Sequence, residues 1–347
     1  MKYSQHNGLL HYCAQLVNAI GNLSEVDRRD ITLMATENVR AFYRDKDYAI
    51  YDLKPIHKLY LPRKSRYDLW HCTYQNSQYF PHSFRGKVVF TIHDFNFLYQ
   101  DFSAGKKRRL LADIQRKIDR ADTVIAISRF VQSEILQYCT VDPSRIKVIY
   151  NGCNIRTDSA VYPPVIKPGR PFFFTIGTIL EKKNFKVLPS MLLKNDFQLV
   201  IAGDTSDTSY CQKIWDFAKR LNVARRVSLI GSIGEGEKNW YLKHCLGLPF
   251  PSLSEGFGLP VLEAMHYGKP TFLSKLTSLP EIGGDAAYYF DHFEPEYMAH
   301  KTMRDLEDYN GNVNKAQEIS DHASQFSWEE AARSYWRIYQ DLLFNRI

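Results

Sequence analysis

The chain has 347 residues with 45 Lys or Arg and 38 Asp or Glu, so its formal net charge is +7. This length predicts about two domains, each with its own core. An apolar fraction of 44% and a charged fraction of 24% are ordinary for globular proteins and exclude a disordered or collagen-like chain. No apolar run approaches the ~20 residues of a membrane-spanning helix, and the N-terminus lacks a signal-peptide pattern. We therefore expect a soluble, cytoplasmic protein.

The distribution of charge and the spacing of the cysteines restrict the possible partners and metal sites of the protein. Residues 1–155 carry a net charge of +8, whereas the remainder carries −1, so the two halves should face different partners. The six cysteines lie far apart and form no CxxC pair, which argues against a zinc site and indicates reduced, mostly buried thiols.

In the first half, short β-rich runs alternate with helical patterns, which is typical of a parallel sheet covered by helices. Five runs indicate buried strands, at residues 31–35, 68–72, 87–93, 123–127 and 147–150. Three segments have apolar residues at helical spacing, at residues 9–20, 107–120 and 129–138. A proline-rich stretch without periodicity follows and is the best linker candidate.

The second half repeats this alternation. Strands are predicted at 172–177, 198–203, 227–231, 248–251, 271–274 and 287–290, and helices at 185–193, 211–221, 238–245, 260–267 and 328–343. The pattern predicts two doubly wound α/β domains. We place them at residues 1–155 and 171–325, with a linker at 156–170 and a C-terminal helix at 326–347 that returns toward the first domain.

The most specific motif is Ser254-Glu-Gly-Phe-Gly-Leu-Pro-Val-Leu-Glu-Ala-Met265. Its glycines let backbone N–H groups approach an anion, and the helix that begins near Pro260 directs its positive end to the same place. Glu255 can accept hydrogen bonds from sugar hydroxyls, and Glu263 can reach a ribose diol. A Gly-rich turn followed by an exposed Glu would be the non-functional explanation. The donor-site residues predicted here are Glu255, Gly256, Phe257, Gly258, Leu259 and Glu263.

This string resembles the Glu-x7-Glu motif of retaining glycosyltransferases of family four (glycosyl transferases group 1), which have the GT-B fold. The resemblance continues through Gly268-Lys-Pro270, Ser278-Leu-Pro-Glu281 and Gly284-Asp-Ala-Ala287, and runs from Gly8 to Phe326-Ser-Trp-Glu329. It implies two Rossmann-like domains facing a cleft, a nucleotide-diphosphate sugar as donor, and no cofactor or bound metal. Gly8 matches the family's first glycine loop. Only seven residues precede it, so the first strand is expected to be short or missing.

A second motif, Gly177-Thr-Ile-Leu-Glu-Lys-Lys-Asn184, follows a predicted strand and opens a helix. Lys182 and Lys183 are placed to neutralise a diphosphate, although two solvated lysines are the alternative. The segment is similar to the family's phosphate-binding loop, in which Lys183 matches the more dependable position. Thr178 replaces an Arg that many relatives carry, and a threonine can offer only a neutral hydrogen bond.

Polar residues also end the strands of the first half. His93 ends the strand at 87–93, and the resemblance places such a histidine against the donor sugar. The expected catalytic residues are therefore His93, Glu255 and Lys183. The tentative acceptor residues are His71, Tyr74, Gln75 and Asp94. In the second half Ser232 and Ile233 could contact the nucleobase, with an ordinary turn equally consistent.

The resemblance implies transfer with retention, in which the donor phosphate accepts the acceptor proton. Lys106, Lys107, Arg108 and Arg109 begin a basic helix that is either a solvated face or a patch for anionic lipid at the inner face of the membrane. We expect a hexosyltransferase of bacterial-type surface polysaccharide or lipopolysaccharide synthesis, acting on a saccharide or lipid-linked saccharide. Two alternatives remain open, another nucleotide-sugar enzyme such as an epimerase or hydrolase, and a non-catalytic nucleotide-sugar-binding subunit. Nucleic-acid binding is not expected, because no nucleic-acid module is present.

Overall fold

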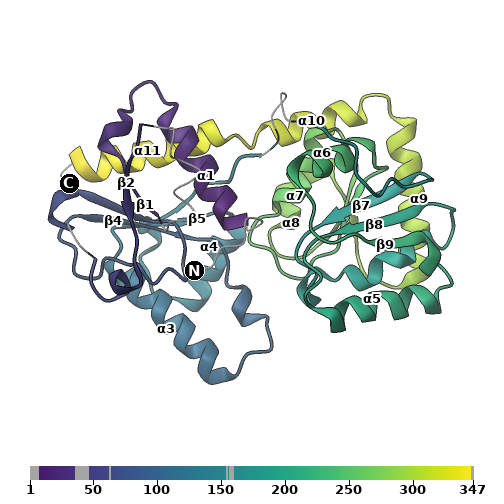
Figure 1. Ribbon diagram of the computed structural model, residues 1–347, viewed down its shortest axis with the longest axis horizontal. Helices are drawn as coiled ribbons and strands as arrows, with labels where there is room; N and C mark the ends of the chain where they lie inside the picture. The colour runs from purple at the N-terminus through teal and green to yellow at the C-terminus, as the bar shows by residue number, and fades with distance from the viewer. Residues whose placement is uncertain (1–7, 36–46, 62–63, 154, 156–159, 345–347) are drawn as a thin grey trace. The chain divides into compact units, whose positions relative to one another are not determined.

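The computed structural model describes residues 8–35, 47–61, 64–153, 155 and 160–344 (Figure 1). The chain divides into two compact units. Unit 1 comprises Met1–Gly152 together with Ser327–Ile347, and unit 2 comprises Cys153–Phe326. All six cysteines are free thiols, but only Cys72 and Cys245 are fully buried, fewer than the sequence suggested.

Unit 1 contains a parallel four-stranded sheet in which chain order equals spatial order. Its strands are β3 (Leu69–Cys72), β4 (Lys87–Ile92), β5 (Thr123–Ala126) and β6 (Ile146–Val148). Strands β4 and β5 are buried at every position except Lys87, because helices cover both faces of a parallel sheet. The connecting helices are α3 (Ala104–Arg120) and α4 (Arg129–Tyr138). These elements confirm the predicted alternation.

A separate parallel pair, β1 (Thr32–Ala35) with β2 (Ala49–Asp52), completes the strands described in unit 1. The sequence did not indicate β2, which is short and only partly buried. The first described element is helix α1 (Gly8–Gly21), of which Gly8 is the first residue. The seven positions before it, on which the expectation of a short first strand rests, lie outside the described residues.

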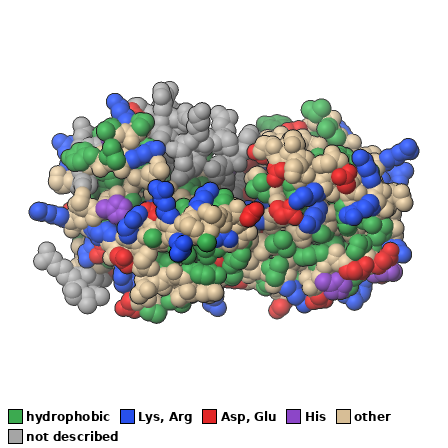
Figure 2. All heavy atoms as spheres, turned by 90° about the horizontal axis from the view of Figure 1, so that it is seen from below, with side chains coloured by type: hydrophobic (Ala, Val, Ile, Leu, Met, Phe, Trp, Pro, Cys, Tyr) green, Lys and Arg blue, Asp and Glu red, His purple; other side chains and the backbone are tan. Residues whose placement is uncertain are grey.

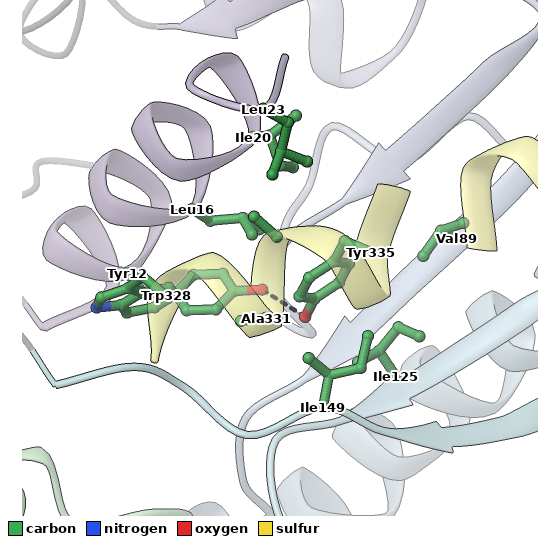
Figure 3. Close-up of a cluster of buried hydrophobic side chains, with 11 residues drawn as sticks. Tyr12, Leu16, Ile20, Leu23, Val89, Ile125, Ile149, Trp328, Ala331 and Tyr335 are labelled. Carbon is green, nitrogen blue, oxygen red and sulfur yellow. Dashed lines mark hydrogen bonds between the residues drawn. The ribbon is translucent and has the colours of Figure 1, made fainter. Parts of the chain in front are cut away.

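The last helix, α11 (Trp328–Phe344), belongs to unit 1 and packs along α1 (Figure 3). Their shared core includes Leu16, Trp328 and Tyr335, and the hydroxyl groups of Tyr12 and Tyr335 are 2.7 Å apart. At Gly152 a Cβ atom would lie 2.2 Å from the backbone nitrogen of Trp328. Only glycine therefore permits this close passage of the chain.

Unit 2 contains two groups of parallel strands that join into one sheet. The strands are β7 (Phe172–Ile176), β8 (Gln198–Ala202), β9 (Val227–Leu229), β10 (Leu248–Phe250), β11 (Thr271–Ser274) and β12 (Tyr288–Phe290). A bridge between Phe173 and Gly247, with a 2.8 Å hydrogen bond from the Leu246 N–H to the Phe172 carbonyl, joins the groups beside β7. The resulting order is β9-β8-β7-β10-β11-β12, the doubly wound Rossmann order.

The helices of unit 2 are α5 (Thr208–Arg220), α6 (Glu235–His244), α7 (Leu259–His266), α8 (Leu279–Gly283), α9 (Pro295–Gly311) and α10 (Lys315–Ser324). One prediction needs correction, since residues 185–193 do not form an α-helix. They form the 3-10 helix η8 (Phe185–Leu192), which contains Pro189. A proline within a helix lacks an N–H and clashes with the preceding turn, which explains the tighter form. No helix among the described residues is long and apolar enough to cross a membrane.

Candidate active site

The strand order of unit 2 identifies where a ligand should bind. In a doubly wound sheet the crevice lies beyond the carboxyl ends of the two strands at which the winding reverses. These strands are β7 and β10, whose following loops begin at Gly177 and Pro251. The N–H of Leu253 donates to the Lys182 carbonyl at 2.7 Å and ties the two loops together. The two strongest sequence motifs thus meet at one point of the sheet.

Lys183 and Glu255 form an ion pair at this switch point. The Lys183 Nζ lies 2.5 Å from the Glu255 Oε1, and the two side chains are only 12% and 11% exposed. The same Nζ lies 4.8 Å from the centre of the Phe250 ring. Gly177 lies beside this lysine with φ +155°, a backbone conformation that other residues rarely adopt. Lys182 is half-buried, and its carbonyl accepts the Leu253 N–H.

The loop that carries Glu255 is held from behind by Thr277 and Ser278. The Glu255 N–H donates to the Thr277 Oγ1 at 3.1 Å. The Ser278 hydroxyl lies 3.0 Å from the Glu255 carbonyl and 2.9 Å from the Phe257 carbonyl. The Ser278-Leu-Pro-Glu281 motif therefore has a structural role. It fixes the loop that carries Glu255, whose N–H groups lie just before the positive end of α7.

Gly258 completes this turn. Its φ of +114° is disfavoured for other residues, and α7 begins at the next position, Leu259. Gly256 and Phe257 are buried beside it. The arrangement suits an anion placed before the helix.

Glu263, on α7, is also paired with a buried lysine. Its Oε1 lies 3.0 Å from the Nζ of Lys238 on α6, and the two side chains are 5% and 8% exposed. The same Nζ contacts Glu235 at 2.8 Å. Burial alone would lower the pKa of Lys238, but the charges of Glu263 and Glu235 outweigh it and raise that pKa. Lys238 was not singled out from the sequence, because a lysine near the start of a helix usually indicates a solvated face.

The ends of β7, β8 and β9 form a shelf of glycines. The Gly177 N–H donates to the Ala202 carbonyl at 3.0 Å, and the Gly203 N–H donates to the Gly231 carbonyl at 2.8 Å. A Cβ at Gly203 would lie 1.8 Å from the Gly177 carbonyl oxygen, whereas one at Gly231 would meet open space. Ser232 and Ile233 follow directly, exposed and half-buried respectively. This edge of the sheet presents mainly backbone atoms and few bulky side chains, an arrangement that suits the binding of a flat ring.

In unit 1, His93 follows the end of β4 and is held in one tautomer. Its Nε2 donates to the Thr73 carbonyl at 2.8 Å, because a carbonyl oxygen can only accept, so Nδ1 is the acceptor of the ring. Burial lowers the pKa of His93, which favours the neutral ring. Tyr12 packs against it edge-on with ring centres 4.5 Å apart. Tyr74, whose ring centre lies 6.2 Å from that of His93, and Asp94, the next residue in the chain, are both half-buried.

Two of the residues assigned to acceptor binding serve the fold instead. Gln75 is 1% exposed, and its amide accepts from the His93 N–H at 3.1 Å and donates to the Asp94 carbonyl at 3.0 Å. His71 contacts the Thr91 hydroxyl at 2.8 Å and the Tyr339 hydroxyl at 2.6 Å through its two ring nitrogens. Both side chains are therefore committed to contacts within unit 1, and we remove them from the acceptor site.

The buried state of His71 predicts a pH effect on stability. Burial, and secondarily the charge of His93, lowers the pKa of His71 from 6.5 to about 3. Between these values the unfolded chain binds a proton that the folded chain does not, so stability is full above 6.5 and declines as pH falls. We expect unfolding free energies from urea titrations to fall below pH 6.5 by up to about 1.4 kcal/mol per pH unit from this group. A His71→Gln variant with the same pH slope as the wild type would contradict this assignment.

The basic helix α3 is less available than its sequence suggests. Lys107 donates to the Leu98 carbonyl at 2.7 Å, and the buried Lys117 donates to the Gln75 carbonyl and to Asp113. Arg120 donates to the Phe84 and Gly86 carbonyls. Only Lys106, Arg108, Arg109 and Arg116 remain exposed among its basic residues. In Figure 2 the Lys and Arg side chains of the face shown are interspersed with acidic and apolar ones.

Two family models match most of the chain. The model for "Glycosyl transferases group 1" matches residues 162–326, and that for "Glycosyltransferase Family 4" matches residues 27–157. The O-antigen chain mannosyltransferase B of Escherichia coli is 25% identical over 278 residues, which are 76% of this chain and 72% of that protein. The O-antigen chain mannosyltransferase RfbU of Salmonella typhimurium is 24% identical, over 57% of this chain and 55% of its own length.

Solved structures show the same fold. Anabaena HepE in complex with UDP-glucose superposes with a TM-score of 0.76 at 17% identity, covering 98% of each chain. The lipopolysaccharide outer core galactosyltransferase WaaB gives 0.63 at 19% identity, covering 99% of this chain and 98% of that one. Both family models fall on the two Rossmann-like units described above. The chain is therefore a glycosyltransferase of the GT-B fold, in which the first unit matches the model for Glycosyltransferase Family 4 and the second unit matches the model for Glycosyl transferases group 1.

Proposed function

We propose that this glycosyltransferase moves a hexose from a nucleotide-diphosphate sugar to a saccharide or lipid-linked saccharide, with retention, in the synthesis of a bacterial-type surface polysaccharide or lipopolysaccharide. The observation that carries the proposal is the Lys183–Glu255 pair at the switch point between β7 and β10. Relatives named as O-antigen mannosyltransferases support the polysaccharide class, and the HepE complex with UDP-glucose supports the donor class.

In the proposed reaction the bond between the anomeric carbon and the diphosphate oxygen breaks as the acceptor oxygen bonds to that carbon. The acceptor proton passes to the leaving diphosphate. Lys183 and the N–H groups at the start of α7 stabilise the negative charge that develops on the leaving group. Because these groups supply positive charge, the proposal includes no bound metal. Glu255 accepts hydrogen bonds from the sugar and keeps the Lys183 ammonium in place.

The proposal gives the remaining roles to the other predicted site residues. Glu263 binds the ribose, the shelf at Gly177, Gly203 and Gly231 receives the nucleobase together with Ser232 and Ile233, and Lys182 assists Lys183 at the diphosphate. In unit 1, His93 offers its Nδ1 acceptor to a donor-sugar hydroxyl, and Gly8 approaches the donor phosphate. Tyr74 and Asp94 stay as acceptor contacts.

Donor binding can be tested by thermal unfolding in the presence of UDP-, GDP-, ADP- and dTDP-sugars. A ligand that binds only the folded state at 100 times its Kd adds about 2.7 kcal/mol to the stability, so one nucleotide class should raise the Tm by several degrees. Product analysis with and without an acceptor should then show sugar transfer and little hydrolysis. Free sugar as the sole product would favour a hydrolase, binding without any turnover would favour a non-catalytic subunit, and no shift with any donor would contradict the proposal.

A further inference from the structure

The loop that follows β4 carries an aromatic side chain to which the proposed reaction gives no role. Tyr99 comes directly after the 3-10 helix η5 (Asn96–Leu98) and is 51% exposed. The other aromatic residues of this loop, Phe95 and Phe97, are 0% and 6% exposed and anchor it in the core. A single exposed apolar side chain is ordinary on a protein surface. The reason to consider Tyr99 is therefore the way in which its hydroxyl group is held.

The Tyr99 hydroxyl group is bonded to a buried carboxylate. It donates to the Glu134 Oε1 at 2.8 Å, and Glu134, on α4, is only 2% exposed. The Phe95 N–H donates to the same carboxylate. Glu134 thus ties Tyr99 to the residue that follows Asp94, at the carboxyl end of β4. Ligands of open α/β sheets bind beyond this end of the strands, so Tyr99 is held at the edge of the sheet where an acceptor can bind.

A carboxylate is a costly choice for a bond that only shapes the loop. Burying a charge costs free energy, and burial, together with the charge of Asp94, raises the pKa of Glu134 to about 7. A neutral glutamine could accept the same hydrogen bonds without that cost. A charged carboxylate, however, accepts the phenol proton of Tyr99 more strongly than a neutral group does. The arrangement therefore favours a fixed orientation of the exposed ring.

The groups around Glu134 come from several elements of unit 1. Asp94 faces it from the end of β4 and Tyr99 from the loop. Tyr138 lies one turn further along α4, and its hydroxyl group interacts with that of Tyr99. Lys107, on α3, donates at 2.7 Å to the backbone carbonyl that precedes Tyr99. The loop is thus held from two helices, while half of the Tyr99 side chain stays open to solvent.

We propose that the sugar ring of a saccharide acceptor stacks on the ring of Tyr99, and that Glu134 is the positioning residue that holds this ring in place. An aromatic face offers a flat apolar surface to the C–H groups of a sugar, while a polar neighbour such as Asp94 can bind its hydroxyl groups. The inference rests on the proposed function, since it adds a group that recognises the acceptor of the same site. Stacking is a binding step, however, and needs no turnover.

Saturation-transfer NMR with the full chain tests the binding step. The probes are methyl α-mannoside, methyl β-galactoside and methyl N-acetyl-β-glucosaminide. At least one of them should receive saturation at its sugar-ring protons from the wild type, and Tyr99→Ala should lose most of that signal. In transfer assays with the same glycoside, Tyr99→Ala should raise the acceptor KM about tenfold. Its kcat should stay within about twofold of the wild type, because uniform binding alone is removed.

The role of Glu134 is tested by the pH dependence of the acceptor KM. In the wild type this KM should rise as the pH falls below about 7, because the protonated carboxyl group accepts the phenol proton more weakly. Glu134→Gln should keep the higher KM at every pH. Tyr99→Phe has no phenol proton and should also lose the pH dependence. A residue that only stabilises the fold would change the Tm without changing this pH profile.

Two variants serve as matched controls. Leu136 is 45% exposed on α4, two residues from Glu134 and therefore on another face of the helix. Asp119 is an exposed carboxylate on α3 that accepts from Gln115 at 2.7 Å. Leu136→Ala and Asp119→Asn should keep the acceptor KM and its pH profile. A Tm within a few degrees of the wild type shows that a variant is folded, and Tyr99→Phe decides the case if Tyr99→Ala does not fold.

The proposal is overturned if the wild type transfers saturation to none of the three glycosides. It is also overturned if folded Tyr99 and Glu134 variants keep the acceptor KM and the pH profile of the wild type, and the proposed transferase function would survive that result. Glycoside binding that depends on Tyr99 but leads to no turnover with any nucleotide-sugar would have the opposite meaning. It would establish the stacking site while contradicting the transferase function.

Discussion

A Lys183→Met variant is expected to lose about 10²–10³-fold in kcat, the cost of removing one preorganised stabiliser of developing negative charge. Methionine keeps much of the length and apolar stem of lysine, so the loop after β7 should still pack over Gly177. The lost ammonium is the group to which the proposed mechanism assigns the leaving diphosphate, and it lies 2.5 Å from Glu255. The measurement is steady-state release of nucleoside diphosphate with the donor identified by thermal unfolding. Glu255→Gln should also lower kcat, because a neutral amide orients the ammonium less strongly.

The control for this prediction lies three residues away. Lys186 pairs with Glu181 at 2.7 Å, with side chains 40% and 52% exposed. An exposed pair of this kind contributes little, so Lys186→Met should keep kcat within about twofold of the wild type. Equal losses in the two lysine variants would point to a general effect of charge on the domain. Turnover by Lys183→Met at the wild-type rate would remove Lys183 from the proposed mechanism.

Much of the fold was predictable because strands buried on both faces leave a direct trace in the sequence. Residues 87–92 and 172–176 are near-continuous apolar runs, and both form central strands. Strand β2 leaves no such trace, because it is short, lies in a separate two-stranded sheet and is not fully buried on either face. The prediction of an α-helix at 185–193 is wrong because of one residue, Pro189. Its effect on the backbone outweighs the helical spacing of the apolar residues.

The sequence motifs of the site could be predicted, but the pairs that their side chains form in the fold could not. Glu255 and Lys183 were each identified, but their ion pair depends on the adjacency of β7 and β10, which no local pattern reveals. His71 is bonded to Tyr339, 268 positions later in the chain, on a helix that returns to unit 1. A polar residue at a strand end therefore indicates a ligand contact only if its side chain is not already bonded to residues that are distant in the sequence.

The Lys238–Glu263 pair predicts an effect on both stability and donor affinity. In Lys238→Met the buried Glu263 carboxylate would lose the Lys238 ammonium, and breaking a buried pair in this way costs about 3–5 kcal/mol. If Glu263 binds the ribose, the same variant should also bind nucleoside diphosphate at least tenfold more weakly. The double variant Lys238→Met/Glu263→Gln should recover part of the stability, because neither charge is left alone, yet should not recover donor affinity.

Lys301 and Asp305 on α9 provide the comparison that separates these two effects. Their side chains are 14% and 6% exposed and 2.7 Å apart, so Lys301→Met breaks a similar pair on another element of the same unit. Urea unfolding should show a loss of stability in both lysine variants, whereas calorimetric titration with nucleoside diphosphate should show weaker binding only in Lys238→Met. Unchanged affinity in a folded Lys238→Met protein would mean that the pair only stabilises the packing of α6 on α7. Loss of affinity in both variants would mean that donor binding follows global stability, because Lys301 lies on an element with no part in the proposed site.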